Sequence, residues 1–429
     1  MDRYLIISAD GHAGPPLAAY RPYLERAFHA DFDELVRRAS RIDTFASISA
    51  RGLILQAHLH RWKDADMAEL RERAKGAWDA RLRMRELDAE GIAAEVIFPD
   101  GQYGNDFPFG GFFGHDTPER RMAGAAAHNR WLAEFCSAEP SRMLGLALII
   151  PFDVDAAVEE IRRAHREGLR GVLLSTAETG LPLYLESRYD PLWATCSELE
   201  LPVHMHGGQT PDIYGAGTAA RQAVIEYEQH FYRRRVLVHL MLGGVFQRYP
   251  RLKFICTESA MDWIPGELGR LDRAFGEKSM ITGIAPSVWL ERSPSEYWRQ
   301  NCAVGATFAS QEELAVWPQL GSHTVMWGAD YPHVEATWPE SRKEIRRTFA
   351  AVPDAERRQM LGQNAARLYG FDLAALASIV ERIGPMPDEF DSLVPEPAGS
   401  SSYTQQDYAD SRVFTYATFG PRLEKSLAK

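Results

Sequence analysis

Two pairs of residues of the kinds that bind metals lie at the ends of short apolar runs. Asp10 and His12 follow the run Tyr4–Ala9, and His204 and His206 close a later run. Within each pair the residues are two apart, and residues two apart on an extended segment point the same way. Each pair can therefore present two side chains to one space. A carboxylate and imidazoles gathered there are typical of a site for a divalent metal ion.

Two further apolar runs are followed by acidic residues. Glu258 comes directly after Leu252–Thr257, and Asp330 comes shortly after Thr324–Gly328, with His333 close behind. Buried together, such carboxylates would repel one another and lose hydration. A divalent cation would relieve both costs and supply a Lewis acid. A cluster of polar side chains satisfied by hydrogen bonds, without an ion, is the alternative explanation.

Eight short apolar runs alternate with helical patterns along the chain. Strands that are apolar on both faces and alternate with helices are typical of a parallel sheet, and eight such units favour a closed (β/α)8 barrel of the TIM type. Reactive groups in these barrels lie at the C-terminal ends of the strands. The expected strands are Tyr4–Ala9, Ala94–Pro99, Met143–Pro151, Gly171–Ser175, Leu201–His206, Leu252–Thr257, Asn301–Gly305 and Thr324–Gly328. Helices are expected at Asp155–Glu167, Asp190–Leu199, Ala219–Phe246 and Pro353–Tyr369.

Two segments do not follow this alternation. Residues from about 15 to 91 form a long, mostly helical insertion, which we expect to cap the mouth of the barrel. The barrel with its insertion is assigned to residues 1–371. Residues 372–429 form a C-terminal extension, either an ordered arm or a loose tail.

The overall composition is that of an ordinary globular protein, with 45% hydrophobic and 25% charged residues. A net charge of −11 argues against a nucleic-acid partner, because no basic cluster is available to neutralise phosphates. No apolar run is long enough to span a membrane, and no signal peptide is apparent. The four cysteines show no Cys-x-x-Cys spacing, which indicates a reduced compartment. We therefore expect a cytoplasmic protein.

Six stretches occur along the chain in this order: SADGHAGPP, NRWLAEFC, LPVHMHGG, GGVFQRYPRLKF, WGADYPH and LGQNAARLYGFD. Together they resemble the amidohydrolase superfamily, within it the group that includes aminocarboxymuconate semialdehyde decarboxylase, from residue 4 to about 372. The resemblance implies that His12, His206 and Asp330 are metal ligands. Asp10 stands where the family usually has a histidine, and a carboxylate is a competent replacement. A homodimer or higher homo-oligomer is also implied.

The sixth strand departs from the pattern of that group. Its decarboxylases carry a catalytic histidine there, whereas this chain has Glu258. A glutamate can ligate the ion, bridge to a second ion or act as a general base, but it cannot act as a cationic polariser. With Glu258 and His333 included, the ligand set suffices for one ion or two. Zn²⁺, Fe²⁺ and Mn²⁺ all accept such donors.

These residues predict a metal-dependent hydrolase acting on a carbonyl bond. A metal-activated water would attack an ester, thioester or amide, Asp330 would move the proton, and Glu258 and His333 would complete the coordination or steer the water. A bulky, partly apolar small-molecule substrate is indicated by the aromatic residues after the second strand, which are Tyr103, Phe107, Phe109, Phe112 and Phe113. The main alternative is a metal-dependent non-oxidative decarboxylase of an aromatic or enoic carboxylate. A barrel that binds a ligand without catalysis is the third interpretation.

Overall fold

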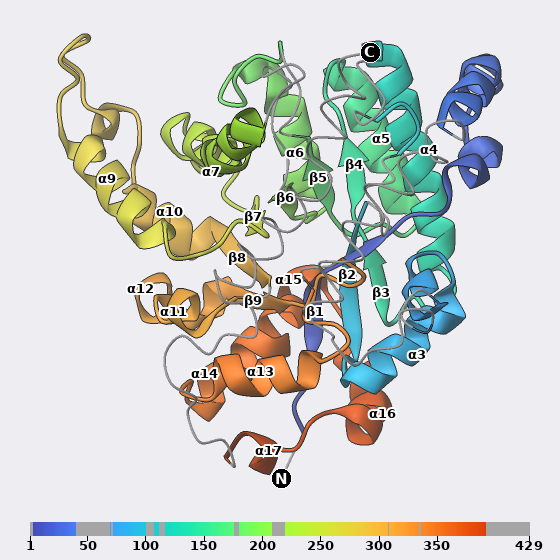
Figure 1. Cartoon of the computed structure of the whole chain (residues 1–429). Coiled ribbons are helices and arrows are strands. Elements are labelled where there is room, and N and C mark those ends of the chain that lie inside the picture. The colour runs from blue at the N-terminus through green and yellow to red at the C-terminus, as the bar shows by residue number, and fades with distance from the viewer. Residues whose placement is uncertain are drawn as a thin grey trace.

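Parallel strands form the core of the molecule (Figure 1). The structure, a computed structural model, describes residues 3–39, 69, 72–99, 107–110, 116–175, 180–207, 219–307, 309–333 and 336–391. Three strands pair in the order β1-β2-β3 and six in the order β4 to β9, each with a parallel neighbour. Their bounds are β1 Ile7–Ala13, β2 Ala94–Pro99, β3 Met143–Gly145, β4 Ala147–Ile149, β5 Val172–Leu174, β6 Val203–His206, β7 Phe254–Thr257, β8 Cys302–Thr307 and β9 Val325–Gly328.

A single residue, Leu146, joins the two sheets between β3 and β4. Its N–H donates to the carbonyl oxygen of Ile97 in β2 at 2.9 Å. The next N–H, that of Ala147, donates to the carbonyl oxygen of Gly171, just before β5, at 2.9 Å. The segment 143–151, predicted as one strand, therefore pairs with β2 in its first half and with β5 in its second.

The ring closes between β9 and β1. Gly11 forms a parallel bridge with Tyr331, three residues beyond the end of β9. The N–H of His12 donates to Tyr331 O at 2.7 Å, and the N–H of Asp330 donates to Asp10 O at 2.9 Å. With both seams hydrogen-bonded, the strands occupy eight positions around a barrel. The predicted (β/α)8 architecture is confirmed.

Burial on both faces explains why the strands appear in the sequence as continuous apolar runs. Every residue of β1 and of β4 to β9 is buried. Helices cover the outside of the barrel, and side chains fill its interior, so neither face of a strand meets water. The alternating pattern of a half-exposed strand is therefore missing.

Helices alternate with the strands around the barrel (Figure 1). Aspartates or threonines cap several of them at the N-terminus, and the cap of the helix predicted at 155–167 is Asp153, which accepts the N–H of Ala156. None of the described helices combines the length and apolar character needed to cross a membrane. Their bounds are α3 Ala80–Glu90, α4 Pro118–Cys136, α5 Val154–Arg166, α6 Asp190–Glu198, α7 Ala219–Leu242, α8 Val245–Arg248, α9 Ile264–Gly276, α10 Pro294–Asn301, α11 Gln311–Leu314, α12 Trp317–Leu320 and α13 Ser341–Phe349.

The helix predicted at 353–369 contains a π-helical turn. It consists of α14 (Asp354–Arg358), the π turn Gln359–Gln363 and α15 (Asn364–Tyr369). Gly362 in the π turn packs against the chain that enters β1, because a Cβ atom there would overlap the carbonyl oxygen of Leu5. The π turn therefore packs closely against the segment that leads into β1.

The predicted cap insertion is only partly described, since residues 40–68, 70 and 71 lie outside the described residues. Its first part, η1 (Leu17–Tyr23), packs on α4, where Tyr20 Oη lies 2.7 Å from His128 Nδ1. Its last part is α3, which leads directly into β2. The insertion of about 15–91 thus contains one of the helices that alternate with the barrel strands.

The beginning of the C-terminal extension packs beside the N-terminal end of β1. It forms α16 (Leu373–Ile383) and α17 (Asp388–Asp391). The N–H of Tyr4 donates to Pro385 O at 2.9 Å, and the Tyr4 and Phe390 rings lie 4.7 Å apart. The predicted arm or tail from 392 to 429 lies outside the described residues.

Substituting Gly362 with alanine tests the packing of the π turn. Gly362→Ala should lower the free energy of unfolding by about 1 to 3 kcal/mol, because the added methyl group meets backbone rather than a movable side chain. Gly266→Ala is the matched control. Gly266 lies in α9, where a Cβ atom would have nothing within 4 Å, so the stability of this variant should stay level or rise by up to about 1 kcal/mol. Urea unfolding followed by circular dichroism measures both, and equal stabilities would contradict the packing described here.

Candidate metal centre

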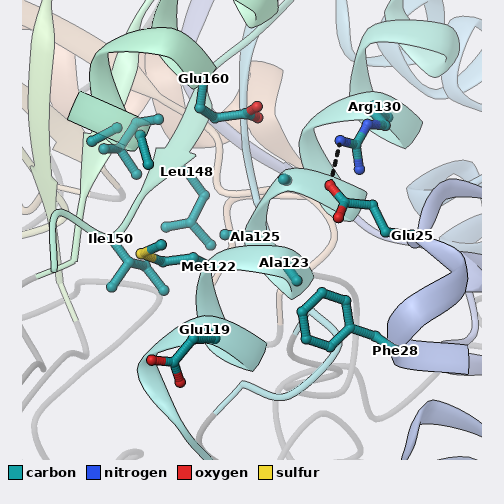
Figure 2. A pocket seen from close by; sticks show the side chains of 14 residues that line it. Glu25, Phe28, Glu119, Met122, Ala123, Ala125, Arg130, Leu148, Ile150 and Glu160 are labelled. Atoms are coloured by element: carbon teal, nitrogen blue, oxygen red, sulfur yellow. Dashed lines mark hydrogen bonds and ion pairs between the residues drawn. The ribbon is translucent and has the colours of Figure 1, made fainter. Parts of the chain in front are cut away.

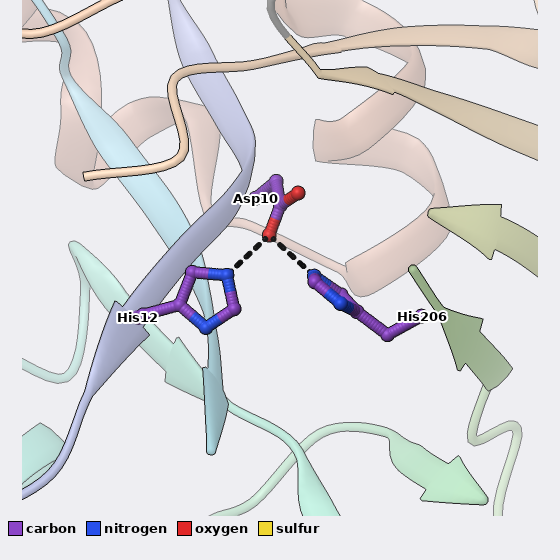
Figure 3. Close-up of side chains that lie close together, drawn as sticks. All are labelled: Asp10, His12 and His206. Carbon is purple, nitrogen blue, oxygen red and sulfur yellow. Dashed lines mark hydrogen bonds and ion pairs between the residues drawn. The ribbon is translucent and has the colours of Figure 1, made fainter. Parts of the chain in front are cut away.

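Asp10 lies between two imidazole rings at the C-terminal side of the barrel strands (Figure 3). Its Oδ1 atom is 3.4 Å from His12 Nε2 and 3.3 Å from His206 Nε2. All three side chains are buried, and His206 ends β6 while the other two lie within β1. The structure therefore brings together the residues that the sequence placed at the ends of two separate strands.

A β-bulge in β1 sets the direction of these side chains. Against β2, Ser8 pairs with Glu95 but Gly11 pairs with Ile97, so β1 has one extra residue between these positions. Such a bulge bends the strand and re-aims its side chains. The spacing of two residues between Asp10 and His12 could not reveal this bulge.

Thr307, at the end of β8, holds the second oxygen of Asp10. Its hydroxyl donates to Asp10 Oδ2 at 2.6 Å, and both residues are buried. A hydrogen bond to a buried carboxylate is stronger than one between neutral groups. Thr307 was not predicted as a site residue, because its only signal in the sequence is a hydroxyl at the end of an apolar strand.

Asp330 and His333 complete the group from the loop after β9. Asp330 Oδ1 is 3.0 Å from His12 Nε2 and 3.2 Å from His333 Nδ1. The His333 ring stacks on His12 with centroids 3.9 Å apart. Asp330 has a left-handed backbone with φ 63°, which is costly for a residue other than glycine and is common at functional sites.

Glu258 approaches His206 from the side opposite Asp10. Its Oε2 atom is 3.1 Å from His206 Nδ1, which also lies 3.2 Å from Gly207 O. Two acceptors at Nδ1 favour a proton on that nitrogen, and Nε2 is the nitrogen directed at Asp10 and placed to ligate a cation. Glu258, predicted as a ligand, therefore lies next to a ligand-type residue and belongs to neither donor group found among the described residues.

His204 lies one layer deeper in the barrel. Its Nδ1 atom is 3.2 Å from Thr257 Oγ1, and its Nε2 atom is 3.2 Å from Tyr369 Oη. Burial and the neighbouring His206 lower the pKa of His204 to about 3. A neutral imidazole between two hydroxyl groups is a structural contact rather than part of the donor groups.

The group carries an excess of negative charge that suits a cation. Burial alone would lower the pKa of His206, but the carboxylates of Asp10 and Glu258 outweigh it and raise the pKa to about 9. Both oxygens of Asp330 are buried and accept no hydrogen bond from the part of the chain that the structure describes. A divalent cation with nitrogen and oxygen ligands fits this donor set.

Two overlapping donor groups share His12. In each group the ligand atoms lie within 4.8 Å of one another; the groups are Asp10, His12 and His206, and His12, Asp330 and His333. Such a spread is compatible with ligands around an ion, and the four residues predicted first as ligands are divided between these two groups.

A cavity of about 310 Å³ lies apart from these donors, between α4, β4 and α5 (Figure 2). Its floor is apolar, with Met122, Leu148 and Ile150, and its rim includes Glu25, which lies 3.5 Å from Arg130. It has no convergent set of imidazoles, so we place the chemistry at the strand ends. Of the five predicted aromatic substrate contacts, Phe109 is buried against other rings and Phe107 packs partly buried against the core. Positions 103, 112 and 113 lie outside the described residues.

Comparison with known proteins agrees with this fold. Residues 56–371 match the amidohydrolase family. Over 330 residues, 71% of this chain and 91% of the relative, the chain is 28% identical to a γ-resorcylate decarboxylase from Rhodococcus jostii. An amidohydrolase structure from Mycobacterium avium superposes with a TM-score of 0.64 at 18% identity, covering 86% of this chain and 99% of that one. A 5-carboxyvanillate decarboxylase structure from Novosphingobium aromaticivorans, with bound manganese, superposes with a TM-score of 0.59 at 20% identity. The superposition covers 86% of this chain and 96% of that one.

The chain therefore belongs to the amidohydrolase family, as its motifs predicted, and is an enzyme of that superfamily. The prediction of a hydrolase is wrong. Relatives that match over most of the chain are named as decarboxylases, including the γ-resorcylate enzymes and the 2-amino-3-carboxymuconate-6-semialdehyde enzyme of Dictyostelium discoideum. The hydrolase prediction gave weight to Glu258 in place of a histidine, and in the structure this carboxylate lies 3.1 Å from Nδ1 of His206.

The bond between Thr307 and Asp10 can be tested in the metal-free protein. Thr307→Val should lower the free energy of unfolding by about 1.5 to 3 kcal/mol, because a buried carboxylate loses a hydrogen bond to its charged form. Thr307→Ser keeps the hydroxyl and should lose less. Thermal and urea unfolding give the comparison; a valine variant at least as stable as the serine variant would show that the hydroxyl does not matter.

Proposed function

We propose that this enzyme is a metal-dependent non-oxidative decarboxylase of an aromatic or enoic carboxylate. The observation that carries the proposal is the match over 91% of a γ-resorcylate decarboxylase, in a chain whose buried strand ends gather Asp10, His12, His206 and Asp330. The same donors would suit other metal-dependent reactions. Among these reactions, the names of the relatives favour decarboxylation.

We assign one divalent ion to these four residues. Nε2 of His12 lies 3.4 Å from Asp10 Oδ1 and 3.0 Å from Asp330 Oδ1, and one nitrogen lone pair serves one ion. Manganese is our first choice because it accepts mixed nitrogen and oxygen ligands and is present in decarboxylase structures of this fold. When bound, the ion would supply a Lewis acid for the oxygens of the substrate carboxylate.

We assign the transfer of the proton to Asp330. In a non-oxidative decarboxylation the bond between carbon and the carboxylate breaks, CO₂ leaves, and the electron pair left on carbon takes up a proton. Asp330 has two buried oxygens without a hydrogen bond among the described residues, so it can hold a proton and deliver it to the vacated carbon. His333, 18% exposed and 3.2 Å from Asp330, lies on the path by which that proton is replaced from solvent.

Glu258 is assigned an orienting role. By accepting the Nδ1 proton of His206 at 3.1 Å, its carboxylate fixes the ring and makes Nε2 a better ligand. A carboxylate behind a ligating histidine is common in metal sites. This assignment keeps Glu258 in the site but removes it from the proton-transfer step.

The first experiment measures metal content and CO₂ release. Elemental analysis of protein purified without added metal should give about one divalent ion per chain. The same protein should release CO₂ from at least one member of a panel of aromatic and enoic carboxylates that includes 2,6-dihydroxybenzoate, and in D₂O the product should gain one deuterium at the vacated carbon. Chelation should stop the reaction, and Mn²⁺ should restore it. Release of an alcohol, thiol or amine without CO₂ would reject the proposal.

The Asp330→Asn variant distinguishes the proposed role of Asp330 in proton transfer from its proposed role as a metal ligand. This variant should fold and keep much of its metal, because an amide oxygen can still ligate, but turnover should fall by about 10²-fold or more without a group that transfers the proton. His206→Ala should lose both metal and activity. Activity of Asp330→Asn within a fewfold of wild type would show that another group carries the proton.

A further inference from the structure

Arg83 of α3 and Glu95 of β2 form a buried ion pair beside β1. The two side chains are 0% and 1% exposed. Arg83 donates from Nε to Glu95 Oε1 at 2.6 Å and from Nη2 to Oε2 at 2.7 Å. Its Nη1 donates to the carbonyl oxygen of His12 at 2.6 Å. The Arg83 guanidinium therefore makes two coplanar hydrogen bonds to the Glu95 carboxylate and a third to the backbone of His12, a proposed ligand.

The backbone between Asp10 and His12 lies directly against this pair. A Cβ atom on Gly11 would be 2.9 Å from Arg83 Nη2 and 2.9 Å from Glu95 Oε2. Only a residue without a Cβ atom allows this approach. The bulge of β1 ends at Gly11, so the ion pair contacts the strand at the position where its side chains are re-aimed.

Arg83 also contacts the strand segment on the other side of the barrel seam. Its Cζ atom lies 4.5 Å from the centroid of the Tyr331 ring, close enough for a cation–π interaction. Tyr331 follows Asp330 directly, and its carbonyl oxygen accepts the N–H of His12 at 2.7 Å. Arg83 therefore contacts two segments: β1, which carries Asp10 and His12, and the loop after β9, which carries Asp330.

We propose that the Arg83–Glu95 pair positions the metal ligands and thereby sets the affinity of the site for its ion. The proposal rests on the metal centre of the proposed function and extends it to two residues outside the donor groups. A buried ion pair is weak evidence of stabilisation, since well-packed apolar residues often replace one at little cost. Metal affinity is therefore the property that this pair is expected to control.

The test is titration of the metal-free, full-length protein with Mn²⁺ alone, followed by the electron paramagnetic resonance signal of the free ion. Arg83→Met and Glu95→Gln should each bind Mn²⁺ about 10- to 100-fold more weakly than wild type, the loss typical when a group that orients a metal ligand is removed. Arg83→Lys keeps the charge but cannot form the planar set of bonds, so its affinity should lie in between.

Arg142→Met is the matched control. Arg142 is also a buried arginine near β2, but its side chain donates to the backbone that precedes the strand, to Ala93 O at 2.8 Å and Ile92 O at 3.0 Å. It also pairs with Asp88 at 2.9 Å. Removing it should lower stability and leave Mn²⁺ affinity within about threefold of wild type, because it contacts no segment that carries a proposed ligand.

Wild-type affinity in Arg83→Met would overturn the proposal, and so would equal losses in Arg83→Met and Arg142→Met. If Arg83→Met does not fold, Arg83→Lys and Glu95→Gln decide in the same way. A wild-type protein that binds no Mn²⁺ would overturn the metal centre and this inference together. Normal Mn²⁺ binding with the expected losses, but no CO₂ release from any carboxylate, would support the positioning role and reject only the proposed reaction.

Discussion

The barrel seam between β1 and β9 is the constraint on which the site depends. The backbone N–H of Asp330 bonds to Asp10 O, and the N–H of His12 bonds to Tyr331 O. Three of these four residues, Asp10, His12 and Asp330, also have side chains that meet at His12 Nε2. Two buried carboxylates held this close repel each other without a cation, so closing the barrel creates an electronegative position at the mouth. Architecture and chemistry are coupled in one pair of strands.

Three residues of the centre have partners that limit their motion. Thr307 holds the second oxygen of Asp10, Glu258 lies against the outer nitrogen of His206, and Arg83 bonds to the carbonyl oxygen of His12. These partners come from three different elements. A site fixed from several elements loses little free energy to reorganisation when an ion binds. Asp330 has no such hydrogen bond among the described residues, which suits a group that must gain and lose a proton.

The error in the predicted reaction came from the weight given to Glu258. The resemblance implied a histidine at this strand end, and from sequence a glutamate there could be a ligand, a bridge or a base. An imidazole has two nitrogens, and the role of a carboxylate depends on which one it faces. Glu258 faces Nδ1 of His206. The substitution therefore changes the support of a proposed ligand, and it carried less information about the reaction than the hydrolase prediction assumed.

The sequence alone determined the barrel and the main donors, because buried parallel strands appear as apolar runs and reactive groups follow their C-terminal ends. Asp10, His12, His206 and Asp330, the proposed ligands, were predicted in this way, and the structure brings them together. Only the tertiary structure decided that the predicted strand 143–151 divides at Leu146 and that β1 contains a bulge. It also decided which residues support the proposed donors. Thr307 and Arg83 are distant from the site in sequence and have no recognisable motif. Their contribution depends on register and on the approach of separate elements, and neither is encoded in local spacing.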